Sequence, residues 1–182
     1  MPVIANISSY NPSSTDKLFF DANIWLNLLN PLGSKLPEIY KENISEFYRK
    51  VLNAKSRIYI TSMILSEFFN AYARNEFKTY EKIKNKKLNY KRDFRDTYLF
   101  KNVIKDIQSL INDNILKDCI KLNDNFSSLN LNSINNNDDF TGYDYNDKFY
   151  SLLCESEDIT IVTADKDFNK SCKAKVITLD YN

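Results

Sequence analysis

The sequence predicts an α/β fold built around a parallel sheet. Short apolar runs of strand length alternate with longer stretches in which apolar residues recur at helical spacing. The run Ile-Thr-Ile-Val-Thr at 159–163 is apolar throughout, which is typical of a strand buried on both faces of a parallel sheet. A chain of 182 residues is long enough for one sizeable core, so we expect residues 1–182 to form a single domain.

The first part of the chain predicts a loose arm and then a strand and a helix. Residues 1–16 end in the turn-forming run Asn-Pro-Ser-Ser and are expected to be a loosely held N-terminal arm. The apolar run at 17–20 predicts the first strand. Helical spacing follows over 22–30, and Pro31 and Gly33 end it.

The middle of the chain predicts a second strand between helices and then an insertion. Apolar residues at steps of three to five predict a helix over 39–52. The β-branched and aromatic run at 57–61 predicts a short strand, and a helix follows from Ser62 to about Arg74. Residues 75–125 predict a helical, partly basic insertion.

The last part of the chain predicts a helix between the insertion and two strands. This helix opens near 143 and runs to about 157, with its apolar residues on one side. The buried strand at 159–163 follows it. A short apolar run at 176–179 predicts the final strand of the sheet.

Composition excludes several kinds of chemistry. The chain has no histidine, which removes Ser-His-Asp and Cys-His catalysis and most zinc sites. Its three cysteines, Cys119, Cys154 and Cys172, show no CxxC pattern and are expected to be reduced. The N-terminus resembles no signal peptide and no apolar run reaches membrane-spanning length, so we expect a soluble, cytoplasmic protein that does not bind membranes.

Charge is unevenly distributed although the net charge is only +1. Residues 138–167 hold nine acids and two lysines, whereas residues 78–96 hold eight bases and three acids. The basic stretch predicts contact with a nucleic-acid backbone, with Tyr80, Tyr90 and Phe94 as stacking partners for bases. A solvated surface, or a docking site for an acidic partner, is the alternative. The bases expected to bind RNA are Lys84, Lys86, Lys87, Lys91 and Arg92.

Two aspartates follow predicted strands directly. Asp21 ends the strand at 17–20, and Asp165 follows the strand at 159–163. In open α/β sheets, ligands bind outside the carboxyl ends of the strands, which favours a functional role for both. The alternative role for Asp21 is that of a helix N-cap.

Two further carboxylates lie near the beginnings of helices. Glu67 is in the second turn of the helix that follows the second strand, and its alternative is a solvent-facing residue beside Asn70 and Arg74. Asp147 is in the first turn of the predicted helix that directly precedes the buried strand at 159–163. Because the helix dipole favours acids there, helix capping by Asp144 and Asp147 is the alternative.

These four carboxylates can converge despite their separation in sequence. Right-handed crossovers place the exits of parallel strands on one edge of the sheet. Like charges gathered there repel one another, and a cation relieves that cost. Oxygen ligands select Mg²⁺ or Mn²⁺, and such a site suits hydrolysis of phosphodiester bonds.

The sequence resembles the PIN-domain ribonucleases, a family that includes the VapC toxins of bacterial toxin–antitoxin pairs. The resemblance covers residues 17–74 and 140–179 and leaves out the insertion. The matching stretches are LFFDAN at 18–23, ITSMILSEF at 60–68, DYND at 144–147 and TADKDF at 163–168.

The resemblance implies a three-layer α/β/α sandwich with a parallel sheet of four or five strands, often as a homodimer. It implies a Mg²⁺- or Mn²⁺-dependent nuclease that cleaves RNA and is neutralised by a cognate antitoxin protein. Its catalytic, metal-binding acids correspond to Asp21, Glu67, Asp147 and Asp165. Asn23 and Thr163 correspond to polar supports, and Asp144 and Asp167 to accessory groups.

Two other functions compete with this one. One is a PIN-like fold without catalysis that binds RNA or protein, although the presence of all four acids argues against it. The other is a phosphatase of the haloacid dehalogenase type, suggested by Asp21 after a strand. That chemistry usually requires a second aspartate at the position that Asn23 occupies.

Overall fold

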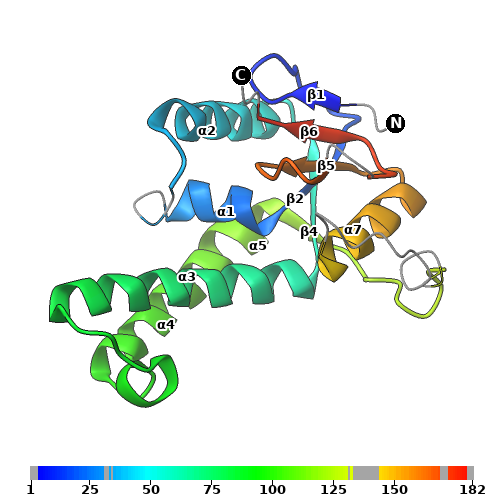
Figure 1. The fold of residues 1–182 in the computed structure, drawn as a ribbon. Helices are drawn as coiled ribbons and strands as arrows, with labels where there is room; N and C mark the ends of the chain where they lie inside the picture. Colours follow the sequence, from blue (N-terminus) through cyan, green and yellow to red (C-terminus); the bar gives the residue numbers. More distant parts are fainter. Residues whose placement is uncertain are drawn as a thin grey trace.

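A parallel sheet forms the centre of the molecule (Figure 1). The computed structural model describes residues 4–30, 33, 35–130, 132, 144–168 and 172–179. Within these residues the sheet has six strands, and every neighbouring pair is parallel. Their order is β1 (Ile4–Asn6), β6 (Val176–Thr178), β5 (Thr160–Thr163), β2 (Lys17–Phe20), β3 (Arg57–Ile60) and β4 (Cys119–Lys121).

Because every neighbouring pair is parallel, the carboxyl ends of the six strands lie at the same edge of the sheet, and helices connect β2 to β3, β3 to β4 and β4 to β5. The described helices are α1 (Ala22–Leu29), α2 (Glu38–Asn53), α3 (Ser62–Lys84), α4 (Tyr98–Leu110), α5 (Leu116–Asp118) and α7 (Tyr145–Ser156). Two π-helical turns, η2 (Tyr90–Phe94) and η3 (Ile111–Ile115), flank α4.

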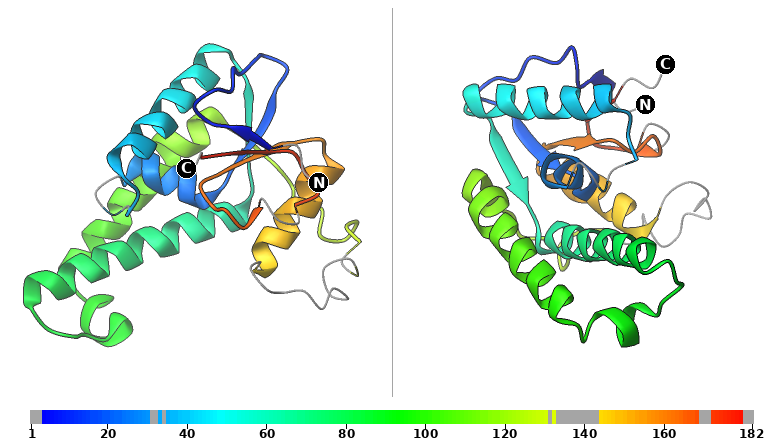
Figure 2. Two further views of the ribbon diagram at one scale, coloured as in Figure 1. Left: turned by 45° about the horizontal axis from the view of Figure 1, so that its top comes forward. Right: turned by 90° about the vertical axis from the view of Figure 1, so that its left-hand side faces the viewer.

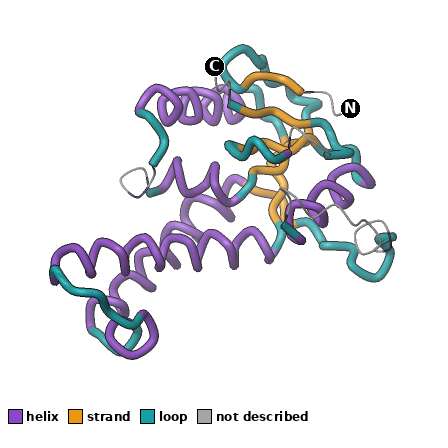
Figure 3. The backbone as a smooth tube through the Cα atoms, in the orientation of Figure 1, coloured by secondary structure: helices purple, strands orange, loops and turns teal. Residues whose placement is uncertain are grey.

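Two adjacent phenylalanines of β2 show how the helices form layers on the sheet. Successive side chains of a strand point to opposite faces. Phe20 packs on Trp25 of α1 and Phe47 of α2, with ring centroids 5.4 and 6.2 Å away. Phe19 packs on Tyr150 of α7, with centroids 5.2 Å apart. Helices α1 and α2 therefore cover one face and α7 the other, as in a three-layer α/β/α sandwich (Figure 3).

The fold class agrees with the prediction, but the sheet is wider than the expected four or five strands. Residues 1–16 are not wholly a loose arm, because β1 pairs with β6 and the following Ile7 is buried. The predicted helical insertion contains β4, which pairs with β3 at the edge of the sheet. Each missed strand is a short edge strand without a continuous apolar run: β1 reads Ile-Ala-Asn and β4 reads Cys-Ile-Lys, whereas the equally short β6 is buried throughout and was predicted.

Helix α3 is longer than predicted. It continues past Arg74 to Lys84, where Asn85 ends it in the left-handed conformation. Its distal half packs against α4 and, with η2, forms a helical arm over residues 75–110 that projects from the sheet (Figure 2). The first ten residues of the predicted insertion, 75–84, are thus an extension of α3.

The three cysteines are free, as expected, with Cys154 and Cys172 buried and Cys119 half-buried. In the described part of the chain, no helix combines the length and apolar character needed to cross a membrane.

Phe19→Ala should destabilise the protein by about 3–5 kcal/mol, because it leaves a cavity between the central strand and α7. Ile83 is 74% exposed at the end of α3, so Ile83→Ala should change the free energy of unfolding by no more than about 0.5 kcal/mol. Urea unfolding of both variants measures the difference. Equal losses would contradict the placement of Phe19 in the core.

Candidate active site

Asp21 lies between the two central strands and α1. It occupies the N-cap position of α1, but its carboxylate makes no N-cap hydrogen bond to the helix. Its Oδ2 atom instead accepts hydrogen bonds from Thr163 Oγ1, at 2.7 Å, and from Asn23 Nδ2. The Asp21 side chain therefore contacts residues at the carboxyl edge of the sheet and does not cap α1.

The residues that follow β5 continue this hydrogen-bond network. Thr163 Oγ1 accepts from Asn23 Nδ2 at 3.1 Å and from the Asp165 backbone N–H at 3.0 Å. Asn23 Oδ1 accepts from the Ala164 N–H at 3.0 Å. Strand β2 and the β5 exit are thereby tied together, and the predicted polar supports Asn23 and Thr163 both lie beside Asp21.

Glu67 is held by two residues of α7. Asn146 Nδ2 and the Tyr150 hydroxyl, the latter at 3.0 Å, both donate to Glu67 Oε1. Burial raises the pKa of this half-buried carboxyl, while the two donors oppose that rise. The sequence analysis did not identify Asn146 and Tyr150 as site residues. They are four positions apart near the start of α7, so they lie on one side of the helix, and this spacing was the available signal.

Asp144 and Asp147 form the capping box of α7. Asp144 Oδ1 accepts from the Asp147 N–H at 3.0 Å, and Asp147 Oδ2 accepts from the Asp144 N–H at 3.4 Å. Helix capping, the alternative for this pair, is therefore part of their role. Burial, followed by the charges of Asp144, Asp21 and Asp165, raises the pKa of Asp147 to about 7.

The fourth acid, Asp165, begins the loop after β5. Its Oδ1 atom accepts from the Asp167 N–H at 2.9 Å, which fixes the turn. Both Asp21 and Asp147 are influenced by the charge of Asp165. Asp167 contributes its backbone to this turn and lines the adjoining cleft.

The acids share one electrostatic environment. Asp21 is only 7% exposed, and burial is the main cause that raises its pKa to about 6. The charges of Glu67 and Asp165 raise it further, whereas the Thr163 hydrogen bond lowers it. Carboxylates from β2, α3, α7 and the β5 exit are thus mutually repelling at one edge of the sheet.

The donor atoms at this edge fit a hard divalent cation. All are carboxylate, amide or hydroxyl oxygens, which Mg²⁺ and Mn²⁺ prefer over nitrogen or sulfur. Within the described residues, no three acidic or cysteine side chains are grouped as a ready metal site. The fit to an ion therefore rests on the chemistry of these oxygens.

An open cleft of about 470 Å³ adjoins the acids. It lies between the start of α1 and the loop after β5, so a substrate could reach Asp165 from solvent. Its lining residues are Asn23, Asn27, Leu36, Ala164, Asp165, Lys166 and Asp167.

The bases predicted to bind RNA are not part of this cluster. Lys84, Lys86, Lys87, Lys91 and Arg92 are exposed at the tip of the helical arm, at the other end of α3 from Glu67 (Figures 1 and 2).

The aromatic residues among these bases do not lie on the surface as the sequence suggested. Phe94 is fully buried and packs on Tyr80 and Tyr90, with ring centroids 5.3 and 5.9 Å away. The guanidinium of Arg74 lies 4.0 Å from the centre of the Tyr90 ring. The expectation that Phe94 stacks on bases is therefore wrong, because its ring is fully buried. Tyr80 and Tyr90 are half-buried against it.

Comparison with known proteins identifies both a family and a fold. The PIN domain matches residues 18–174. A chain in the crystal structure of VapBC2 from Rickettsia felis, bound to a DNA fragment from their promoter, is similar with a TM-score of 0.50 and 12% identity. The match covers 90% of this chain and 98% of the other. No curated protein matches the sequence significantly.

Thr163→Val should destabilise the protein by about 1–3 kcal/mol, because it removes the donor to a buried carboxylate while preserving the shape of the side chain. Thr163→Ser keeps the hydroxyl and should retain most of the stability. Chemical unfolding of both variants measures the effect. If valine is tolerated as well as serine, the hydroxyl does not support Asp21.

Proposed function

Because the chain belongs to the PIN domain family, we propose that it is a metal-dependent endoribonuclease of the VapC toxin type. PIN domains are generally nucleases, and nucleases of this family generally use divalent metal ions. The observation that carries the proposal is the convergence of Asp21, Glu67, Asp147 and Asp165 from four separate elements on one sheet edge.

In this proposal, the four acids hold one or more Mg²⁺ or Mn²⁺ ions. When bound, the metal activates water for attack on phosphorus and neutralises charge on the phosphate. The oxygen-only donor set and the mutual repulsion of the acids support this assignment.

The residues around the acids position them. Thr163 and Asn23 fix Asp21 by donating to the same oxygen, and Asn146 and Tyr150 fix Glu67 in the same way. Preorganised ligands lower the cost of ordering side chains when an ion and a substrate bind. Asp144 and Asp167 are accessory. Asp144 caps the first turn of α7, which contains Asp147, and the Asp167 N–H donates to the Asp165 carboxylate in the loop after β5.

The phosphatase alternative is disfavoured by the contacts of Asn23. Its amide nitrogen donates to Asp21 and Thr163, and its oxygen accepts from the Ala164 N–H. This residue is therefore committed to supporting the cluster, and an aspartate in its place would lose both donated hydrogen bonds.

The same family assignment supports two further proposals on partners. A cognate antitoxin protein is one, since the similar crystal structure is of VapBC2. A homodimer is the other, as PIN-domain toxins often adopt. Size-exclusion chromatography with light scattering measures the second directly.

Asp21→Asn should abolish most RNA cleavage and leave the fold intact. One oxygen of Asp21 accepts from both Thr163 and Asn23, and the single amide oxygen of asparagine can accept from both in the same way. The substitution removes one charge from the cluster. Cleavage of single-stranded RNA with Mg²⁺ or Mn²⁺, beside circular dichroism, measures both effects.

A phosphomonoester substrate in the same assay separates the competing functions. Cleavage of RNA without release of phosphate from the monoester supports the ribonuclease. A folded Asp21→Asn protein with full activity would exclude these acids as the catalytic centre, and a wild-type protein that binds but never cleaves RNA would favour the binding module.

Millimolar Mn²⁺ or Mg²⁺ should raise the melting temperature of the metal-free protein. A cation that binds only the folded protein stabilises it by RT ln(1 + [L]/Kd), and the unfolded chain does not gather these acids. The matched control is the double variant Asp147→Asn/Asp165→Asn, for which the rise should be lost. An equal rise in both proteins would place the metal elsewhere.

A further inference from the structure

We infer that the tip of the helical arm is a remote anchor for the RNA backbone, so that the preferred substrate is long enough to reach from the acids to the arm tip. This inference rests on the proposed ribonuclease function and specifies its substrate. It concerns Lys84, Lys86 and Lys87, together with the π-helical turn η2 that follows them.

The distance between the two regions follows from one unbroken helix. Glu67 and Lys84 are both in α3, in its second turn and at its last residue. At ~1.5 Å of rise per residue, they are separated by about 25 Å along the helix axis. A stacked strand that rises ~3.4 Å per nucleotide needs about seven nucleotides to span this distance.

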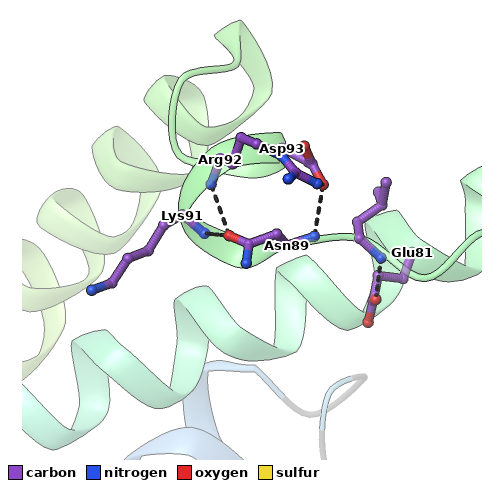
Figure 4. Close-up of polar contacts among 6 residues, drawn as sticks. Glu81, Asn89, Lys91, Arg92 and Asp93 are labelled. Atoms are coloured by element: carbon purple, nitrogen blue, oxygen red, sulfur yellow. Dashed lines mark hydrogen bonds and ion pairs between the residues drawn. The ribbon is translucent and has the colours of Figure 1, made fainter.

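Two of the three acids in residues 78–96 accept hydrogen bonds from the backbone of the arm tip. Glu81 accepts from the Leu88 N–H at 2.9 Å. Asp93 accepts from the Asn89 N–H at 2.8 Å and pairs with Arg92, whose hydrogen bonds lower the pKa of Asp93 to about 2 (Figure 4). These acids are therefore occupied in shaping the loop.

The lysines of the tip make no ion pair of this kind within the described residues, although the Lys84 ammonium lies 5.5 Å from the centre of the Tyr80 ring and the charge of Lys86 helps to lower the pKa of Asp93. In the part of the chain that the structure describes, Lys84, Lys86, Lys87 and Lys91 form no ion pair with an acidic side chain. An open hollow of about 300 Å³ lies beside Lys86 and Lys87, and its other lining residues are Glu81, Lys82 and Asn85. Exposed ammonium groups around a hollow are suited to the phosphates of a flexible strand.

The tip is also ordered before any ligand binds. The Asn89 side chain accepts from the N–H groups of Lys91 and Arg92, at 3.0 Å each, and so caps η2 (Figure 4). Below it, the buried ring of Phe94 packs against Phe77 and Phe100. The lysines are therefore presented from a folded platform, which reduces the entropy lost on binding.

Charge at the acidic edge explains why a second contact is needed. Asp144, Asp147, Asp165 and Asp167 lie beside Asp21 and Glu67 at this edge, where the acids raise one another's pKa values. A polyanion is repelled from such an edge except where a cation intervenes. The part of the RNA that lies away from the metal site therefore needs a basic surface elsewhere. Residues 78–96, which include the arm tip, hold eight bases and three acids.

The test compares two single-stranded RNAs of mixed sequence, one of about three and one of about 20 nucleotides, of which only the longer can span the distance. Binding is measured with Mg²⁺ across a range of salt concentrations, in the Asp21→Asn background so that RNA is not cut. The variant is Lys84→Gln/Lys86→Gln/Lys87→Gln. For the long RNA it should flatten the slope of log K against log salt by up to about two units, at ~0.7 per phosphate contact.

Binding of the short RNA should be unchanged in the same variant. In the active protein, the lysine substitutions should raise KM for the long RNA and leave kcat at saturation nearly unaltered. The control variant, Lys50→Gln/Lys55→Gln/Lys175→Gln, removes the same charge at the amino ends of the strands and should behave as wild type.

Three results would overturn the inference. The arm variant could bind the long RNA with wild-type affinity and salt slope, which would leave the tip to an acidic protein partner. It could weaken both RNAs equally, or the control could weaken binding as much as the arm variant. By contrast, if the unmodified active protein cleaves neither RNA with Mg²⁺ or Mn²⁺, the proposed function itself fails.

Discussion

The hydrogen bond from Thr163 to Asp21 joins the two central strands at the point where negative charge is concentrated. Burying Asp21 is unfavourable, and its pKa of about 6 shows that this cost exceeds what the Thr163 hydrogen bond recovers. The apolar packing of Phe19 and Phe20 on opposite faces of β2 fixes the backbone at this position. The packing of the sheet therefore keeps the Asp21 carboxylate buried, although burial is unfavourable for a charged group.

The position of Glu67 depends on a different contact. Both donors from α7 meet its Oε1 atom, so α3 and α7 are coupled through one carboxylate oxygen. Tyr150 contributes twice, because its ring also packs on Phe19 in the central strand. A displacement of α7 would thus move its own Asp147 and also disturb Glu67, which accepts both hydrogen bonds from that helix. The acids form a mechanically linked set although they belong to separate elements.

The sequence predicted the parts of this arrangement that depend on period and position. Apolar periodicity located β2, β3, β5 and the helices between them, and the carboxyl-edge rule brought Asp21 and Asp165 together. The edge strands β1 and β4 were not predicted because neither has a continuous apolar run, whereas β6, also three residues long, is buried and apolar.

Contacts between distant residues were beyond the sequence patterns. The pairing of Glu67 with Asn146 and Tyr150 joins residues about eighty positions apart, and nothing local to either segment encodes it. The same holds for the aromatic residues of the arm. Because Tyr80, Tyr90 and Phe94 alternate with lysines, the sequence favoured exposed rings that stack on bases. In the structure the two tyrosines pack against the buried Phe94 instead.

This aromatic core explains how a strongly basic tip can remain folded. Repulsion between exposed lysines is weakened by water and by salt, which screens charges over ~10 Å at 0.1 M. Burying a ring such as Phe94 contributes about 1.5–3 kcal/mol, and Phe77 and Phe100 pack directly on it. Apolar packing therefore dominates the stability of the tip, while the exposed lysines determine its charge. Because these two properties reside in different side chains, the charge of the arm can change without loss of its shape.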